Sequence, residues 1–317
     1  MKVIATCPTR LSLFGSGTDL DSFSRIYSGR VINMAINIRQ KVELLTNDDM
    51  WSTDAHITIP TDATTELVYP ILEAYGINGL HHANLVSSFE GVIGAGLGSS
   101  ASFAVCLIGA IHRALHIPLE RTTIARKAFE IEVGTLGWLG GRQDQWASAF
   151  GGFNLMEFGQ DVKVTSLSRK WAENLLPFLL LVYAGGRRES RTLQEGLRVL
   201  TSEQIDTLTK IKEKTYTAME YFESYNIEGL GRVLDETWQL KKQSNKGVSN
   251  SQVDRIYEIA IKAGAWGGKI MGAGQAGYML FMCDKTKREN VVQELKKENV
   301  EEVDFEADYT GLSTRIL

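Results

Sequence analysis

The feature that most constrains this chain is a glycine-rich run, Gly94-Ala95-Gly96-Leu97-Gly98-Ser99-Ser100, which leads directly into an apolar helical pattern. Glycines allow positive φ and let the backbone approach a ligand closely. The helix that follows presents unpaired N–H groups and the positive end of its dipole to the loop. Phosphate oxygens bind well at such a helix start. The run therefore predicts a nucleotide-binding loop.

Two other phosphate-binding signatures fit poorly. A Walker A loop needs a lysine before its serine or threonine, and no lysine precedes Ser99 or Ser100. A second glycine run, residues 272–277, satisfies the letters of the dinucleotide fingerprint G-x-G-x-x-G. That fingerprint requires a helix after the glycines. The short apolar run Tyr278–Cys283 follows instead and predicts a strand.

Length and composition predict an ordinary globular protein of two domains. The chain has 317 residues, whereas single hydrophobic cores stop growing at about 250–300 residues. A polar connection begins at Gly159, and we place the domains at residues 1–165 and 166–317.

Net charge and cysteine content bear on the binding partners and on the cellular compartment of the protein. The net charge of −4 argues against a nucleic-acid partner. Cys7, Cys106 and Cys283 lie far apart, which predicts buried free thiols in a reducing compartment. We expect no signal peptide, because the sequence starts with the strand pattern Val3–Thr6 rather than a charged segment and a long apolar stretch. We expect no membrane partner, because no apolar run approaches the roughly 20 residues of a membrane span. The expected location is the cytoplasm, and the oligomeric state stays open, a homodimer included.

Hydrophobic periodicity predicts interleaved strands and helices. The glycine loop should lead into a helix over Ser100–Leu115, and a second helix should span Leu119–Val133. The glycine-dense loop over residues 134–141 is a candidate functional segment. The other expected elements are strands at Lys2–Cys7, Val31–Ile38, Lys41–Leu45, Asn84–Ser88, Phe153–Phe158 and Phe178–Tyr183, helices at Glu66–Tyr75, Gln145–Phe150, Ser251–Ala263 and Lys285–Glu298, a helical stretch over residues 190–240, and one or two strands in Val303–Leu317.

Three stretches in this order resemble the three motifs of the GHMP kinase superfamily, which includes galactokinase, homoserine kinase and mevalonate kinase. They are Pro8–Leu20 (PTRLSLFGSGTDL), the glycine–serine loop and Gly267–Gly274 (GGKIMGAG). The resemblance covers nearly the whole chain. It implies an α+β fold of two domains, the first like domain 2 of ribosomal protein S5 and the second ferredoxin-like, with ATP in the cleft between them.

Within the superfamily the chain resembles the sugar kinases. The stretch Gly141–Asn154 (GRQDQWASAFGGFN) and the Gly-Thr-Asp-Leu of the first motif carry this likeness. Together with Leu181–Ser190 and Trp238–Lys242 they are similar to kinases of D-glycero-D-manno-heptose 7-phosphate. The resemblance implies an ATP-dependent phosphotransferase in nucleotide-sugar biosynthesis that phosphorylates the anomeric O1 hydroxyl to give the 1,7-bisphosphate.

The resemblance also implies the sites for ATP and Mg²⁺. The phosphates would lie on Gly94, Gly96, Leu97, Gly98, Ser99 and Ser100. Mg²⁺, which prefers oxygen ligands, would bind the Ser100 hydroxyl and Glu132. Glu132 lies twelve residues before Asp144, the separation of the family's magnesium-binding glutamate and catalytic aspartate. Taken alone, Glu132 would read as a solvated helix carboxylate.

Asp144 would be the catalytic carboxylate that takes or orients the proton of the substrate hydroxyl. An N-cap aspartate is the plainer interpretation of its position. Arg10 would lie near Asp144 and stabilise charge on the transferring phosphoryl group; otherwise it is a surface salt-bridge partner. Whether Asp144 is a true base or a positioning charge stays open.

The sugar would bind Asp19, Thr18, Gly17, Gly272 and Gly274. A phosphorylated sugar also needs a second anion site, for which Arg142, Arg187, Arg188 and Lys241 are candidates, although each alone would read as a solvated surface charge. Two departures from the family pattern bear on the substrate. Ser16-Gly17 stand where galactokinase has Glu-His, which argues against galactose, and Gln275-Ala276 stand where two glycines are common.

Three alternatives remain at this stage. The chain could phosphorylate a free sugar such as fucose, galactose or an N-acetylhexosamine. It could bind ATP and sugar without turnover and regulate a partner, which the presence of Arg10, Ser100, Glu132 and Asp144 disfavours. It could act in isoprenoid synthesis, which Asp19 and the Gly-Arg-Gln-Asp-Gln loop disfavour.

Overall fold

Two long antiparallel strands form the centre of the first sheet. β1 (Lys2–Phe14) pairs with β2 (Gly29–Thr46) along its whole length. We expected three shorter strands in this part of the chain. Register shifts between Pro8 and Thr9 and between Ser12 and Phe14 let the ladder continue past residues that interrupt the sequence pattern. The computed structural model describes residues 1–46, 65–77, 83–186, 195–245 and 247–317.

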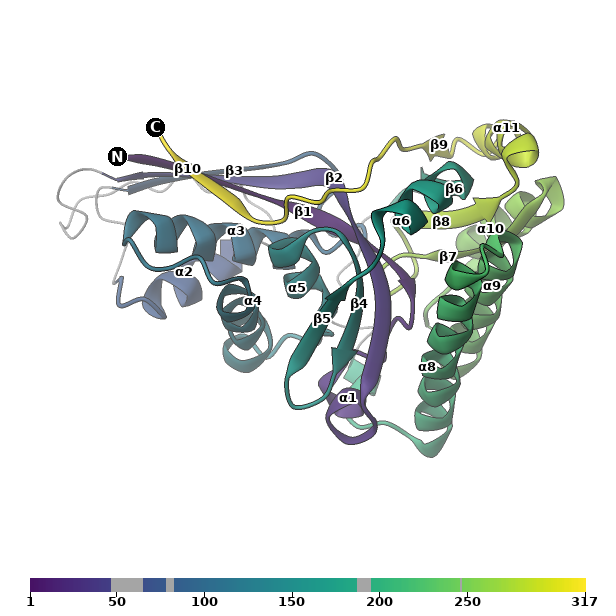
Figure 1. Ribbon diagram of the computed structural model, residues 1–317, viewed down its shortest axis with the longest axis horizontal. Coiled ribbons are helices and arrows are strands. Elements are labelled where there is room, and N and C mark those ends of the chain that lie inside the picture. Colours follow the sequence, from purple (N-terminus) through teal and green to yellow (C-terminus); the bar gives the residue numbers. More distant parts are fainter. Residues whose placement is uncertain (47–64, 78–82, 187–194, 246) are drawn as a thin grey trace.

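The first sheet has the strand order β10-β1-β2-β4-β5, and β3 also pairs with β2. Helices α2, α3, α4 and α5 lie on one face (Figure 1) and share a buried core with that face of the sheet. The remaining bounds in this half are α1 (Asp21–Tyr27), α2 (Thr65–Glu73), β3 (Ala83–Phe89), α3 (Ser99–Ala114), α4 (Arg121–Phe129), η1 (Glu130–Thr135), α5 (Gln143–Phe150), β4 (Phe153–Phe158) and β5 (Val162–Ser166).

The second sheet has the order β7-β8-β6-β9. Helices α10 and α11 bury Ile256, Val291 and Leu295 in one core with strand residues Val182 and Phe281. The bounds are α6 (Arg169–Leu175), η2 (Leu176–Phe178), β6 (Leu179–Tyr183), η3 (Glu195–Leu197), α8 (Ser202–Glu223), α9 (Ile227–Ser244), α10 (Ser251–Ala263), β7 (Ala265–Ile270), β8 (Tyr278–Cys283), α11 (Lys285–Lys296), β9 (Glu301–Glu302) and β10 (Ser313–Ile316).

A third core joins the two sheets. Leu13 and Met34 of the first sheet pack in one buried cluster with Phe222, Leu234 and Leu280 of the second half. Full burial of such side chains contributes about 1.5–3 kcal/mol each. This shared core fixes the two halves against each other near the place where the two glycine loops meet at Gly96 and Gly272.

Several predicted elements are confirmed, with changes at their ends. The strand after the second glycine run is β8, so that run is not a dinucleotide fingerprint. The expected helix Leu119–Val133 is wrong in its last part, because the chain winds into the π-helical segment η1 after Phe129. The expected helical stretch over residues 190–240 contains two helices, α8 and α9, which are separated at residues 224–226. Its residues 190–194 lie outside the described part of the chain.

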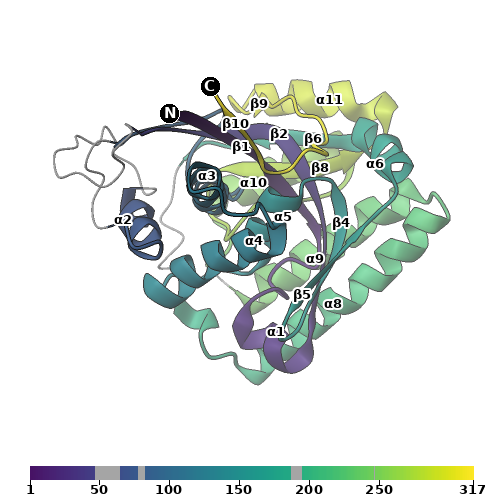
Figure 2. The same cartoon turned by 60° about the vertical axis from the view of Figure 1, so that its left-hand side comes forward.

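The C-terminal residues return to the first sheet. β10 pairs antiparallel with β1, from Thr6↔Ser313 to Val3↔Ile316. The N–H of Leu317 donates to the carbonyl of Lys2 at 2.8 Å. The two termini therefore lie side by side (Figures 1 and 2). The predicted boundary at residue 165 falls at the end of β5, but the last strand of the chain lies with the first half.

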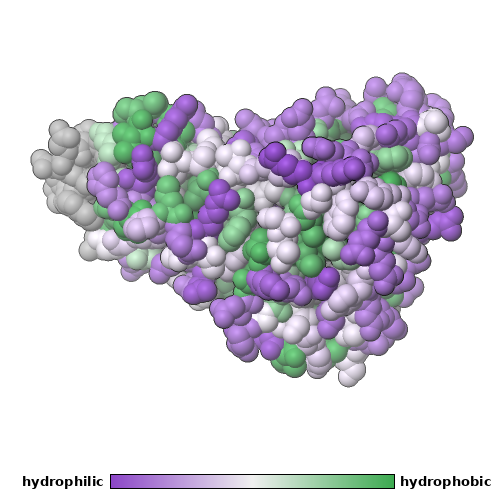
Figure 3. Space-filling view, in the orientation of Figure 1, coloured by the Kyte–Doolittle hydropathy of each residue, from purple (hydrophilic) through white to green (hydrophobic). Residues whose placement is uncertain are grey.

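The surface in Figure 3 is mainly hydrophilic, with small apolar groups between the charged residues. Among the described residues, no helix combines the length and the apolar character needed to cross a bilayer. All three cysteines are buried free thiols, as expected.

Candidate active site

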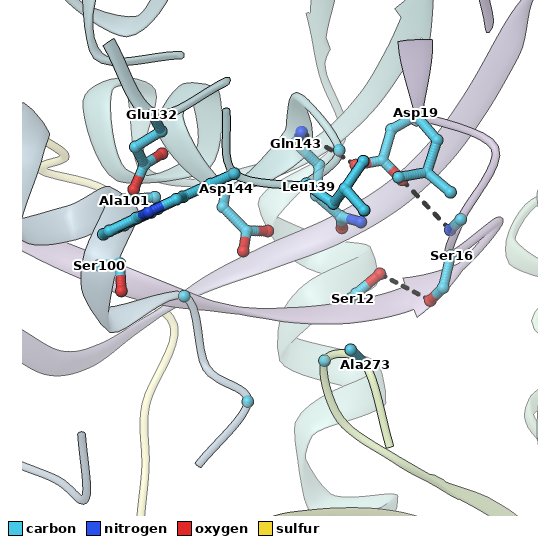
Figure 4. A pocket seen from close by; sticks show the side chains of 18 of the residues that line it. Ser12, Ser16, Asp19, Ser100, Ala101, Glu132, Leu139, Gln143, Asp144 and Ala273 are labelled. Carbon is cyan, nitrogen blue, oxygen red and sulfur yellow. Dashed lines mark hydrogen bonds between the residues drawn. The ribbon is translucent and has the colours of Figure 1, made fainter. Parts of the chain in front are cut away.

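One pocket lies where the three motif stretches and the loop before α5 meet. Figure 4 shows Ser100 and Glu132 at one side of Asp144, with Ser12, Ser16 and Asp19 at the other side. The pocket is lined by Arg10, Ser12, Ser16, Gly17, Asp19, Leu20, Gly94, Gly96, Gly98, Ser99, Ser100, Ala101, Glu132, Val133, Trp138, Leu139, Gly140, Gly141, Gln143, Asp144, Gln145, Leu197, Lys241, Asn245, Gly272 and Ala273.

The glycine loop ends at the first residues of α3. Gly94, Gly96 and Gly98 all have positive φ, and Gly98 is the N-cap in the left-handed region. Ser99 Oγ accepts a hydrogen bond from the Gly94 N–H at 3.2 Å, which closes the loop onto the helix. The loop thus places a helix N-terminus and the Ser99 and Ser100 side chains at the pocket wall.

The second and third motifs pack glycine against glycine. A Cβ on Gly96 would lie 2.6 Å from the Met271 carbonyl oxygen, and a Cβ on Gly272 would lie 2.7 Å from the Gly96 Cα. Neither position has room for a side chain. In the third motif, Gln275 takes φ +64°, a conformation that glycine adopts without strain. The departure from the family's glycine therefore falls on a left-handed residue.

Arg10 and Asp144 form a bidentate ion pair. The Arg10 Nε and Nη2 atoms donate to the two Asp144 carboxylate oxygens, each at 2.7 Å. Nη1 of Arg10 donates to the Gly96 carbonyl at 2.8 Å, and the Arg10 backbone N–H donates to the Leu97 carbonyl. Arg10 thus ties the carboxylate to the phosphate loop, and this closeness to Asp144 is as expected.

Asp19 is buried at the other end of the pocket. Its Oδ2 accepts the Gln143 backbone N–H at 3.1 Å, and its Oδ1 accepts the Gly17 N–H at 3.2 Å. Burial raises the pKa of Asp19, the nearby Asp144 raises it further, and the hydrogen bonds from Gln143 oppose this. A Cβ on Gly141 would lie 1.8 Å from Asp19 Oδ2, so the glycine is required where the chain crosses this carboxylate.

Glu132 lies in the π-helical segment η1, and such segments are frequent at functional sites. Its side chain is buried and accepts a hydrogen bond from Gln145 Nε2. Burial raises the Glu132 pKa to about 8, the hydrogen bond from Gln145 lowers it and Asp144 raises it. Glu132 forms no ion pair with any residue that the structure describes, and a buried carboxylate of this kind fits a hard cation. Within the described ranges, no cluster of three or more His, Cys, Asp or Glu side chains forms a complete metal site.

Four predicted residues lie outside the pocket lining. Thr18 is buried, and its hydroxyl donates to the carbonyls of Gly15 and Arg30. Leu97 is a core residue, and the Cα of Gly274 lies against Val248. Arg142 pairs with Asp21 at 3.0 Å and donates to the Gly159 carbonyl at 2.7 Å, so its guanidinium holds the β4–β5 turn.

Arg187 and Arg188 lie outside the described residues. Lys241 does line the pocket, and its Nζ donates to the Gly272 carbonyl at 3.0 Å. The other predicted residues that line the pocket are Arg10, Gly17, Asp19, Gly94, Gly96, Gly98, Ser99, Ser100, Glu132, Asp144 and Gly272.

Sequence reasoning did not select Ser12, Ser16, Gln143 or Gln145 as site residues. Ser12 and Ser16 lie within the first motif, and the two glutamines flank Asp144. Both glutamines line the pocket, and each has a buried Oε1 atom without a hydrogen-bond partner among the described residues. Buried acceptors are rarely left unpaired, so these atoms mark places where a ligand could donate.

Comparison with known proteins agrees with the geometry. The family model of the GHMP kinases N terminal domain matches residues 65–152, and the model of the GHMP kinases C terminal region matches residues 218–301. The chain is 32% identical to D-glycero-alpha-D-manno-heptose 7-phosphate kinase from Campylobacter jejuni, with 99% of each chain covered. It is 27% identical to mevalonate kinase from Pyrococcus furiosus, with 91% of each covered.

Two solved structures give the same result. The crystal structure of a D-glycero-D-manno-heptose 1-phosphate kinase from Bacteroides thetaiotaomicron superposes with a TM-score of 0.79 at 25% identity and 99% coverage of both chains. A putative sugar kinase from Campylobacter jejuni superposes with a TM-score of 0.77 at 29% identity, covering 99% of this chain and 98% of that one.

Proposed function

The chain belongs to the GHMP kinases, and from this premise we propose that it transfers the γ-phosphoryl group of ATP to the anomeric O1 of D-glycero-D-manno-heptose 7-phosphate. As a member of this family it is a phosphotransferase, and its relatives support a heptose-phosphate sugar as the acceptor. The names of those relatives place the phosphate at different positions of the heptose. The position of transfer is therefore the part that an experiment must decide.

The observation that carries the proposal is the shared pocket of Ser99, Ser100 and Asp144. The helix start would hold the β- and γ-phosphates, and Arg10 would stabilise charge on the group in transfer. The O1 oxygen would attack the γ-phosphorus in line. The bond between the γ-phosphorus and the β–γ bridging oxygen would break, and ADP would leave. The Asp144 carboxylate would orient the O1 hydroxyl or take its proton.

A magnesium ion fits beside this helix start. Glu132 and the Ser100 hydroxyl supply oxygen atoms on one side of the pocket, and Figure 4 shows both on the same side of Asp144. When bound, Mg²⁺ would neutralise charge on the phosphate oxygens. Glu132 would have to give up its proton for this, and Gln145 would keep the carboxylate turned toward the ion.

The test is product analysis. We would incubate the protein with ATP, Mg²⁺ and a panel consisting of heptose 7-phosphate, heptose, fucose, galactose, N-acetylhexosamines and mevalonate, and measure ADP release. ³¹P NMR of the product identifies the phosphorylated oxygen, because an O1 phosphate couples to the anomeric proton. Preferred turnover of heptose 7-phosphate with a new anomeric phosphate is expected. Preferred turnover of a free sugar would contradict the proposal, and binding without ADP release would indicate a regulator.

A further inference from the structure

A buried lysine lies beneath the acceptor end of the pocket. Lys269 is on β7 and is only 5% exposed. Its Nζ donates to the Leu13 carbonyl at 3.3 Å and to Ser16 Oγ, both in the first motif. In the part of the chain that the structure describes, Lys269 takes part in no ion pair. Lysine is almost never fully buried without a charged partner, so this ammonium group needs an explanation.

The charged groups that face Lys269 come from three elements. Arg10 of β1 and Lys241 of α9 add positive charge, and Asp19 before α1 adds negative charge. Burial first, and then Lys241 and Arg10, lower the pKa of Lys269 well below its ordinary value, with Asp19 opposing them. Positive charge from Lys241 and Arg10 thus outweighs the negative charge of Asp19 at Lys269, and a bound anion would favour the charged form of this lysine.

Two serines connect this charge to the pocket. Ser12 and Ser16 both line it, and their Oγ atoms lie 2.8 Å apart. In its charged form Lys269 donates hydrogen bonds and cannot accept one, so Ser16 Oγ is the acceptor in this pair. If Ser12 also donates to Ser16, the Ser16 proton is left to point into the pocket. A hydroxyl polarised in this way by an ammonium group is a strong donor to an anionic oxygen.

The position of the serines favours the acceptor over the triphosphate as the source of this anion. In Figure 4, Asp144 lies between Ser100 and Glu132 on one side and Ser12 and Ser16 on the other. A nucleotide phosphate on the α3 terminus would therefore lie on the far side of Asp144. An anionic group at Ser16 would then belong to the acceptor.

We propose that Ser12, Ser16 and Lys269 form an anion subsite that binds the phosphate ester of the acceptor sugar, with the Ser16 hydroxyl in contact and Lys269 as the positioning charge behind it. This inference rests on the proposed function, because it assumes that the acceptor is a sugar phosphate. It adds a site that is separate from the arginine candidates of the sequence.

The experiment compares binding of heptose 7-phosphate with binding of heptose by calorimetry, at saturating non-hydrolysable ATP analogue. The variants are Lys269→Met, Ser16→Ala and, as a matched control, Lys262→Met on the exposed face of α10, where Lys262 pairs with Glu258. Thermal midpoints are measured for all three. Inorganic phosphate serves as a further probe, as a competitor of heptose 7-phosphate at saturating ATP.

Lys269→Met and Ser16→Ala should each weaken the binding of heptose 7-phosphate by about tenfold or more, which corresponds to the loss of a charge-assisted hydrogen bond. Binding of heptose should stay nearly unchanged, and inhibition by inorganic phosphate should weaken in parallel. The thermal midpoint of Lys269→Met should not fall, because an apolar residue of similar size often replaces a buried charge without loss. Lys262→Met should behave as wild type.

Equal weakening of both ligands, or no weakening, would overturn the subsite. A lowered midpoint in Lys269→Met with normal binding by Ser16→Ala would make the lysine a structural tie between β7 and β1. The proposed function fails separately. If wild type binds heptose 7-phosphate more tightly than Lys269→Met does but does not phosphorylate O1, the subsite stands and the assignment of O1 as the acceptor falls. If it phosphorylates heptose and heptose 7-phosphate with equal kcat/KM, the kinase stands and the subsite falls.

Discussion

The α-carbon of Gly98 lies against the carboxylate of Asp144. A Cβ on Gly98 would be 3.1 Å from Asp144 Oδ2 and 3.2 Å from its Cγ. The N-cap residue of α3 and the proposed catalytic carboxylate are therefore in direct contact, although 46 positions separate them in the sequence. The absence of a side chain at Gly98 sets how closely the carboxylate can approach the start of α3.

Gly98→Ala tests this contact. Its φ of +83° adds strain of roughly 1–2 kcal/mol for alanine, and the new methyl group pushes on Asp144. We expect a loss of kcat beyond what the lower thermal midpoint explains. Gly137→Ala is the control, because Gly137 also has positive φ but no atom within 4 Å of its Cβ position. Equal effects of the two variants on kcat would show that the contact is unimportant.

Asp144→Asn tests the role of the carboxylate. If Asp144 acts as a general base, kcat should fall by about 10²–10⁴-fold. The ATP affinity should change much less, because the helix start and the serines are intact. Steady-state kinetics together with a nucleotide-binding titration separate the two quantities. Near-normal turnover would remove Asp144 from the chemistry and leave it as a partner of Arg10.

Gly141→Ala tests the proposed sugar contact of Asp19. The new methyl group cannot coexist with the Asp19 carboxylate, which would lie 1.8 Å away, so the carboxylate must move. We expect the substitution to raise the KM for the sugar more than the KM for ATP. Gly159→Ala is a matched control, since its Cβ position has no atom within 4 Å. A proportionate rise in both KM values would mean that the loop, rather than Asp19, was disturbed.

Glu132 should make the stability of the metal-free protein depend on pH. Its pKa is raised to about 8 in the folded chain, from the ordinary value of 4.5. Between these values the folded state keeps a proton that the unfolded state has released, so stability falls as the pH rises through this range. The side chain of Glu132→Gln stays neutral, so the stability of this variant relative to wild type should increase from pH 5 to pH 9.

Thermal midpoints in the presence of a chelator measure this difference across the pH range. Glu130→Gln, at an exposed position of the same segment, controls for the substitution itself. Parallel curves for wild type and Glu132→Gln would show that the buried carboxylate does not titrate in this range.

Part of this site could be predicted from local sequence patterns. The glycine loop and α3 are readable because glycine, serine and an apolar helical period follow one another without a break. The π-helical turn at Glu132 is not, because residues 121–133 hold no glycine or proline that would mark a change of winding after Phe129. The resemblance supplied the closeness of Arg10 to Asp144, which no local pattern indicates.

Other features of the site depend on contacts between residues far apart in the sequence, which no local pattern predicts. Lys269 and Ser16 meet across 253 positions, and a lysine at the end of a strand gives no sign that it will be buried. Arg142 shows the opposite case. Its place near Asp144 in the sequence suggests a ligand contact, but its guanidinium forms an ion pair with Asp21 and donates to the carbonyl of Gly159. Neither outcome follows from residue type, because each depends on which loop the fold brings nearby.

The pairing of β10 with β1 has a consequence for synthesis of the chain. Ser313–Ile316 cover one edge of the strand that carries Arg10. Thr6 and Ser313 pair across 307 positions, so this edge stays uncovered while the residues between them are translated. The first half of the protein can therefore collapse early but cannot complete its sheet before β10 has been made, and a nascent chain stalled before Ser313 would leave an unpaired strand edge open to neighbouring polypeptides.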